Sequence, residues 1–266
     1  MSMRNAVAVI AITTLPLVYA CGGGGEAPKE APKPAEAPKT DAAAPAAAAP
    51  AGGAATGTAS ISGKVSFDGT VPPAEKVKVS GDPVCQAAHK GGLERQPLLV
   101  KDGGLANVVV YVKSGATGSY PPPAAHVELN QIGCTYDPHV VALQVGQTLD
   151  IVNSDPVMHN IHPHPKLNQE FNMGQPKPGT KPKVFDKAEV LIPVGCDVHP
   201  WMRSYIAVLD NPFYAVTKED GTFEIKGLPA GDYEIDAVHE KAKGDTAKVT
   251  VKDGEAAKLN FTLKAS

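Results

Sequence analysis

The stretch ISGKVSF, residues 61–67, alternates along its length and places Ile61, Val65 and Phe67 on one face. This two-residue period is typical of a β-strand with one buried side, and it recurs in QVGQTLDIV at 144–152 and KLNFTLK at 258–264. Glycine-bearing turns such as FDGT and EDGT punctuate the pattern, and 26 glycines and 25 prolines in 266 residues disfavour long helices. We therefore expect an all-β protein.

The charge of the chain is nearly balanced. It has 25 lysines and arginines against 28 aspartates and glutamates, a formal net charge of -3, and no basic runs in its globular part. A nucleic-acid backbone needs a basic surface. We expect no nucleic-acid partner.

The first twenty residues, MSMRNAVAVIAITTLPLVYA, carry an arginine and then a short apolar run that ends in a small residue before Cys21. This pattern is typical of an export signal and is too short to span a membrane. The ending LVYAC resembles the lipobox of bacterial lipoproteins, which implies a signal peptide over residues 1–21 and a lipidated Cys21. The implied location is the bacterial cell envelope, lipid-anchored to a membrane and facing the periplasm or the cell surface. The alternative is an ordinary secretory signal cut nearby.

Residues 22–58 have the composition of a spacer. Alanine, proline and glycine make up 27 of these 37 residues, and there is no aromatic or branched aliphatic side chain to build a core. We expect a disordered linker whose reach lies between about 30 Å as a flexible coil and about 110 Å as polyproline II.

The C-terminal stretch from about Tyr214 to Leu263 resembles the carboxypeptidase regulatory-like family, a prealbumin-type β-sandwich. The resemblance lies in the acidic-glycine turn at Asp220 and Gly221 and in LPAGDY at 228–233. It implies a small non-catalytic β-sandwich.

The stretch CDVHPWM, residues 196–202, combines a thiol, an imidazole and a thioether in Cys196, His199 and Met202. With a second imidazole these groups form the ligand set of a blue-copper electron-transfer site. That imidazole appears in IVNSDPVMHNIH, where an apolar strand ends and a short polar loop leads to His159.

The order VNSDPVMHN and then CDVHPWMRSYIAV resembles the cupredoxin family, in its amicyanin-like form. The resemblance implies a Greek-key β-sandwich or barrel that holds one type 1 copper, with His159, Cys196 and His199 as equatorial ligands and Met202 as the weak axial ligand. One departure is PVG before the cysteine, where the family commonly has an aromatic residue.

The cupredoxin-like stretch interrupts the regulatory-like one, because strand patterns like those that open the regulatory-like sandwich occur far upstream, at 61–69 and 107–112. We expect a first part of that sandwich at 59–114 with an insertion at 72–104, a cupredoxin domain at 115–210, and the remainder at 211–266. Two consecutive domains are the alternative.

His199 and Trp201 are the expected electron-transfer surface, with the ring edge of His199 in an apolar patch suited to transient docking. A core position at the end of the barrel is the other interpretation of Trp201. The nearby His162 and His164 could form a second metal-capture patch. We expect exposed loop residues instead, because no carboxylate or cysteine accompanies them at ligand spacing.

The two remaining cysteines, Cys85 and Cys134, are expected to form a disulfide in an oxidising compartment. The alternative is a structural metal site made with His89 and His139.

These expectations describe a membrane-tethered carrier of single electrons between transient redox donor and acceptor proteins. We expect no enzyme, because the loop lacks the second cysteine of a binuclear copper centre and HPH is the only His-x-His pair. The alternatives are a periplasmic copper-binding or delivery module and a non-catalytic surface binding module.

Overall fold

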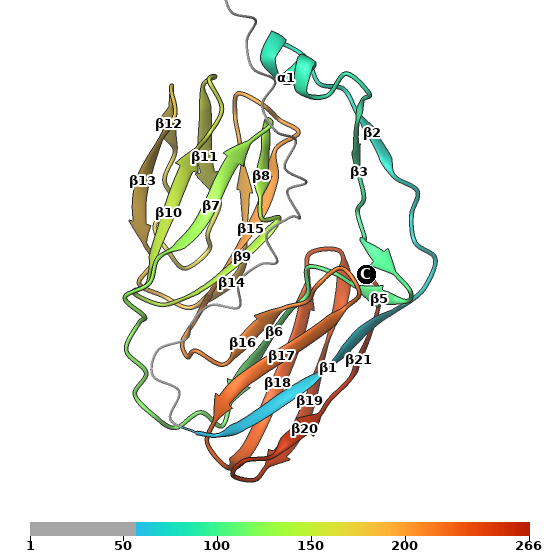
Figure 1. Ribbon diagram of the computed structural model, residues 1–266, viewed down its shortest axis with the longest axis vertical. Coiled ribbons are helices and arrows are strands. Elements are labelled where there is room, and N and C mark those ends of the chain that lie inside the picture. Colours follow the sequence, from blue (N-terminus) through green and yellow to red (C-terminus); the bar gives the residue numbers. More distant parts are fainter. Residues whose placement is uncertain (1–56) are drawn as a thin grey trace, which may run out of the picture. The chain divides into compact units, whose positions relative to one another are not determined.

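The computed structural model describes residues 57–266, which form β-strands over most of their length (Figure 1). The predicted signal segment, Cys21 and the predicted linker up to residue 56 lie outside the described residues. Within the described part the one helix is α1 (Pro83–Ala88). No helix in residues 57–266 is long and apolar enough to cross a bilayer. The expected all-β class is confirmed.

The first sheet joins strands from the two ends of the described chain. β1 is hydrogen-bonded antiparallel to β17 and parallel to β21, and Figure 1 shows it in blue among orange and red strands. The order along the sheet is β16, β6, β18, β19, β21, β1, β5 and β4, and β17 and β20 also pair with β1. The strands are β1 (Ala59–Asp68), β4 (Val100–Lys101), β5 (Gly104–Leu105), β6 (Val109–Ser114), β16 (Tyr214–Val216), β17 (Thr222–Leu228), β18 (Gly231–His239), β19 (Ala242–Val251), β20 (Ala256–Lys258) and β21 (Phe261–Ala265).

The alternating side chains of these strands supply one hydrophobic core. Ile61, Val65 and Leu263 are fully buried in it. The turn before β17 needs a glycine, because Gly221 has a φ of +79° and a Cβ there would lie 2.5 Å from the carbonyl oxygen of Val65.

Two further sheets are built from the chain between β6 and β16. One has the order β13, β10, β7, β8, and the other has the order β12, β11, β14, β15, β9. Their strands are β7 (Val127–Ile132), β8 (Thr135–Asp137), β9 (Val140–Gln144), β10 (Thr148–Asn153), β11 (His159–Pro163), β12 (Met173–Gln175), β13 (Gly179–Val184), β14 (Glu189–Gly195) and β15 (Arg203–Leu209). Side chains of both sheets form a second core, which includes Leu149, Ile151, Ile192 and Ile206.

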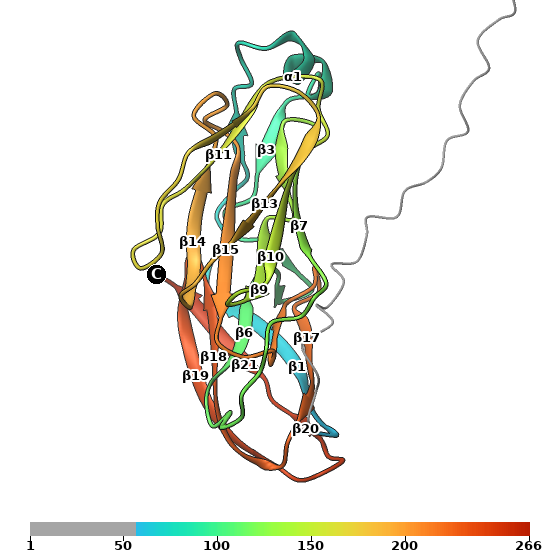
Figure 2. The ribbon, with the colours of Figure 1, turned by 90° about the vertical axis from the view of Figure 1, so that its left-hand side faces the viewer.

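The strands β14 and β15 form an antiparallel hairpin, seen side by side in Figure 2. Gly195 pairs with Arg203 at its end, so residues 196–202 make the connecting loop. β11 lies on the other side of β14, with His162 opposite Gly195. The strand end at His159 and the loop 196–202 are therefore neighbours in space.

A short segment, which we call the cap segment (residues 75–95), carries α1 between the paired strands β2 (Glu75–Val77) and β3 (Leu93–Arg95). The helix begins where the Asp82 side chain accepts a hydrogen bond from Val84 N at 2.7 Å, with Pro83 in its first turn. Its buried Cys85 belongs to the second core.

Candidate metal centre

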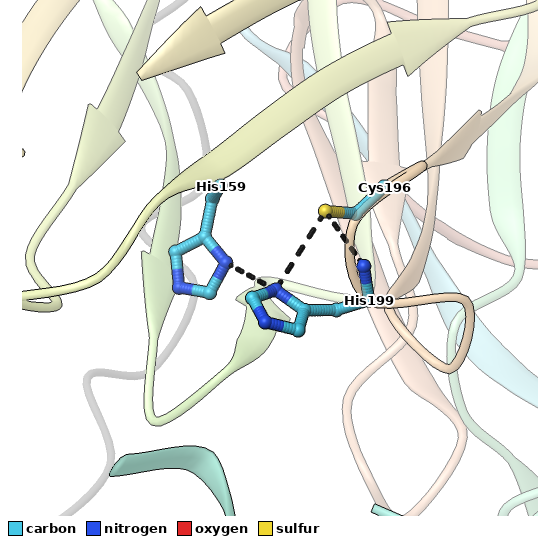
Figure 3. Close-up of side chains that lie close together, drawn as sticks. All are labelled: His159, Cys196 and His199. Atoms are coloured by element: carbon cyan, nitrogen blue, oxygen red, sulfur yellow. Dashed lines mark hydrogen bonds between the residues drawn. The ribbon is translucent and has the colours of Figure 1, made fainter. Parts of the chain in front are cut away.

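Three potential metal ligands converge at the end of the β11 and β14 strands (Figure 3). One ligand atom from each of His159, Cys196 and His199 lies within 4.8 Å of the other two. The Nδ1 atoms of the histidines are 2.9 Å apart, and Cys196 Sγ is 3.9 Å from His199 Nδ1. Two nitrogens that bind one ion at about 2 Å are about 3 Å apart, so both imidazoles present the same type of atom at a suitable separation.

The centre is shielded from solvent. The relative exposures are 0% for His159, 2% for Cys196 and 2% for His199. Burial, followed by the influence of the His159 imidazole, lowers the pKa of His199 below its ordinary value. A neutral imidazole keeps a lone pair for a metal ion.

The far nitrogen of His159 is held by a carboxylate. His159 Nε2 lies 2.8 Å from Asp155 Oδ2, and Asp155 also accepts hydrogen bonds from the backbone N–H groups of Gly133 and Cys134 at 2.8 and 2.7 Å. A proton on Nε2 leaves Nδ1 free to bind metal. This is the carboxylate–histidine arrangement common behind metal ligands.

Asn160, the residue after His159, fixes the loop that carries Cys196. Its Oδ1 atom accepts hydrogen bonds from Asp197 N at 2.7 Å and from the Cys196 thiol at 3.2 Å. The backbone N–H of His199 in turn points at Cys196 Sγ from 3.4 Å. The two segments that supply the ligands are thus hydrogen-bonded to each other.

Tyr136 ties the same two segments from behind. Its hydroxyl donates to the carbonyl oxygen of Asn160 at 2.6 Å and also lies 3.0 Å from that of Gly195. Burial raises the pKa of Tyr136 well above its ordinary range, so the hydroxyl keeps its proton.

Met202, the predicted axial ligand, ends the loop. Its backbone N–H donates to the carbonyl oxygen of His199 at 2.9 Å, which closes a turn, and its side chain is 1% exposed within the second core. The structure therefore buries all four predicted ligands at this end of the sandwich.

The expected electron-transfer surface differs from what the structure shows. His199 is 2% exposed and Trp201 is 6% exposed, so neither ring forms an open docking patch. The reason is the cap segment, since Cys85 Sγ lies 3.6 Å from His199 Nε2. Trp201 packs in the core, with its indole N–H donating to the carbonyl oxygen of Cys134 at 3.0 Å.

Cys85 and Cys134 are joined by a disulfide with an S–S distance of 2.03 Å. The alternative metal site is not assembled, because disulfide sulfurs are poor ligands and the two histidines face elsewhere. His89 Nε2 lies 2.7 Å from the carbonyl oxygen of Gly133, and His139 Nε2 lies 2.7 Å from Glu240 Oε1.

His162 and His164 lie outside the buried centre, and their side chains are 20% and 50% exposed. The expectation of exposed loop residues holds for His164, whereas His162 lies in β11 and is only partly exposed. The sequence shows no carboxylate at ligand spacing from these histidines, but the fold supplies one. The Glu170 carboxylate lies 2.8 Å from the His162 ring and 3.3 Å from the His164 ring.

Several supporting residues were not found by sequence reasoning. Asp155 precedes His159 by four residues in SDPVMH, and this spacing is the one local signal for it. Tyr136 and Glu170 carry no such signal. Strand pairing brings Tyr136 to the backbone of Asn160 and Gly195, and loop folding brings Glu170 to His162 and His164.

Comparison with protein-family models finds one match, the carboxypeptidase regulatory-like domain, over residues 206–264. This confirms the resemblance seen in the C-terminal stretch and extends it upstream into β15. The match covers well under half of the chain. No curated protein matches the chain.

Solved structures similar to part of this chain include a copper-containing nitrite reductase from Thermus scotoductus SA-01, with 21% identity, a TM-score of 0.31, and coverage of 36% of this chain and 25% of that one. A purple cupredoxin from Nitrosopumilus maritimus has 22% identity and a TM-score of 0.27 over 31% of this chain and 98% of that one. Amicyanin from Paracoccus versutus has 22% identity and a TM-score of 0.29, and the match covers 37% of this chain and 96% of amicyanin. The matched part thus spans a quarter of the reductase.

Proposed function

We propose that the protein is an exported, membrane-tethered type 1 copper protein that carries single electrons between transient redox partners and catalyses no reaction. The observation that carries this proposal is the convergence of three buried ligands, Cys196, His159 and His199, with the Nδ1 atoms of the two histidines 2.9 Å apart. A soft thiolate with two imidazoles suits copper in both oxidation states.

The chain's own residues would keep such a centre rigid. Strand pairing fixes His159 and the 196–202 loop, while Asp155 orients the His159 ring and Asn160 holds the loop through the backbone N–H of Asp197. Copper, when bound, would supply a one-electron couple between Cu(I) and Cu(II). A ligand set that moves little on a change of metal charge favours fast electron transfer. The expected signal and Cys21 support the tether and the envelope location.

The test is the colour of the purified protein with copper(II). An intense blue thiolate band is expected, and Cys196→Ser should abolish it. Val198→Ala is a matched control, because Val198 lies in the same loop and is 45% exposed, so its truncation should leave the band intact. Survival of the band in Cys196→Ser would contradict the ligand assignment.

A second candidate function, copper binding and delivery, is favoured by His162 and His164, which lie outside the buried centre with side chains 20% and 50% exposed. Such a protein would give a pale copper(II) complex whose metal exchanges readily with a chelator. A blue complex that resists exchange favours the electron carrier.

A further inference from the structure

A cluster of His162, His164 and Glu170 stands outside the buried centre and has no role in it. One ligand atom from each of the three residues lies within 4.8 Å of the others. The carboxylate oxygen Glu170 Oε1 is shared by both rings, 2.8 Å from His162 Nε2 and 3.3 Å from His164 Nδ1. Ligands placed about 2.1 Å from one tetrahedral ion are about 3.4 Å apart, so small movements would let an ion enter.

The elements behind these side chains hold them in place. His162 lies in β11, opposite Gly195 of β14. The backbone N–H of His164 donates to the carbonyl oxygen of Pro193 at 2.8 Å, which extends this pairing by one more bond. Both rings come from the same strand end, with centroids 4.2 Å apart. The pair is therefore positioned by the sheet.

A second carboxylate orients His162 from the opposite side. His162 Nδ1 lies 3.2 Å from both oxygens of Asp197, while its Nε2 faces Glu170. Asp197 is itself held by the side-chain amides of Asn172 and Asn160. A histidine that binds metal through one nitrogen commonly donates the other N–H to a carboxylate, and His162 has this arrangement.

We propose that His162, His164 and Glu170 form a second, solvent-open site for a divalent transition-metal ion of the copper(II) or zinc(II) type, with Asp197 as a positioning residue. Two imidazoles and one carboxylate are the ligands these ions accept, and the side chains of His164 and Glu170 are 50% and 56% exposed, which leaves room for water or an exchanging ligand. The site is distinct from the Cys196 centre and does not depend on the function proposed for it.

The experiment counts copper(II) bound by the full chain and by His164→Ala and Glu170→Gln. The matched control is His126→Ala, since His126 is 52% exposed and pairs with one carboxylate, Asp150, at 2.9 Å. Wild type and His126→Ala should bind one more equivalent than the two site variants, or bind it about tenfold or more tightly. All these side chains are about half exposed, so the variants should fold, and circular dichroism verifies this.

Equal copper binding by wild type and both site variants overturns the proposal, and so does an equal loss in His126→Ala. The spectrum of the extra ion gives a second readout. A tetragonal nitrogen and oxygen signal without a thiolate band supports the site, whereas a thiolate band that disappears with His164→Ala contradicts it. If the buried centre is not a type 1 copper site, the blue band would be missing. The difference of one copper equivalent between wild type and the two site variants would still be measured.

Discussion

His199 Nε2 lies 3.6 Å from Cys85 Sγ, so a disulfide covers the ring edge that the sequence pattern predicts to be at the surface. Cys85 comes from α1 in the cap segment, and Cys134 lies in the turn between β7 and β8. The disulfide thus connects the cover of the candidate metal centre to its framework.

Removing this disulfide is expected to destabilise the protein. The bridge joins residues 49 positions apart, and the chain-entropy model assigns about 4 kcal/mol to a loop of that length. The double variant Cys85→Ala/Cys134→Ala should therefore unfold at lower denaturant concentration. Chemical unfolding of the metal-free protein measures the change. An unchanged midpoint would show that the cap segment packs without help from the bridge.

The same double variant tests whether the cap segment limits electron exchange. Loosening the cover over His199 should bring the ring edge closer to solvent and speed oxidation of the copper(I) protein by a small inorganic oxidant. Stopped-flow absorbance at the thiolate band measures the rate. A slower reaction in the variant would contradict this expectation and indicate that electrons leave through the disulfide.

Asp155→Asn should weaken metal binding, because Asp155 holds the far nitrogen of the His159 ring at 2.8 Å. Loss of such a partner typically lowers metal affinity by about 10- to 100-fold. Competition with a chelator measures the affinity. Asp150→Asn is the control, since Asp150 pairs in the same way with the exposed His126, and it should leave the affinity unchanged. Equal affinities in both variants would argue against a role for Asp155.

Met202→Leu should preserve the blue colour and raise the reduction potential, because loss of a weak sulfur donor favours the reduced ion. The expected rise is tens of millivolts, with about 59 mV for each tenfold change in a one-electron equilibrium. Voltammetry measures it, and Met173→Leu, in β12, is the matched control. An unchanged potential would remove Met202 from the ligand set.

The strand pattern and the order of the ligand residues could be predicted from sequence because both are local. Alternation in 61–67 marks a buried strand face, and Cys196, His199 and Met202 lie within one hairpin loop. His159 is 37 residues before Cys196 in the sequence, but the apolar strand and short polar loop of IVNSDPVMHNIH predicted it as a ligand. The structure brings these residues together.

The features that the sequence could not predict depend on long-range packing. A disulfide between Cys85 and Cys134 does not by itself place α1 against His199, since the position of the cap segment depends on how its apolar side chains pack into the second core. Glu170 likewise meets His162 and His164 only after the loop that follows β11 has folded.

X-ray absorption at the copper edge of the copper-loaded protein tests the central claim most directly. The account predicts one short-bonded sulfur and two imidazole nitrogens around the copper of the buried centre, supplied by Cys196, His159 and His199, with the Met202 sulfur as a weak and longer contact. The short sulfur contribution should be lost in Cys196→Ser. A wild-type spectrum with only nitrogen and oxygen neighbours would contradict it.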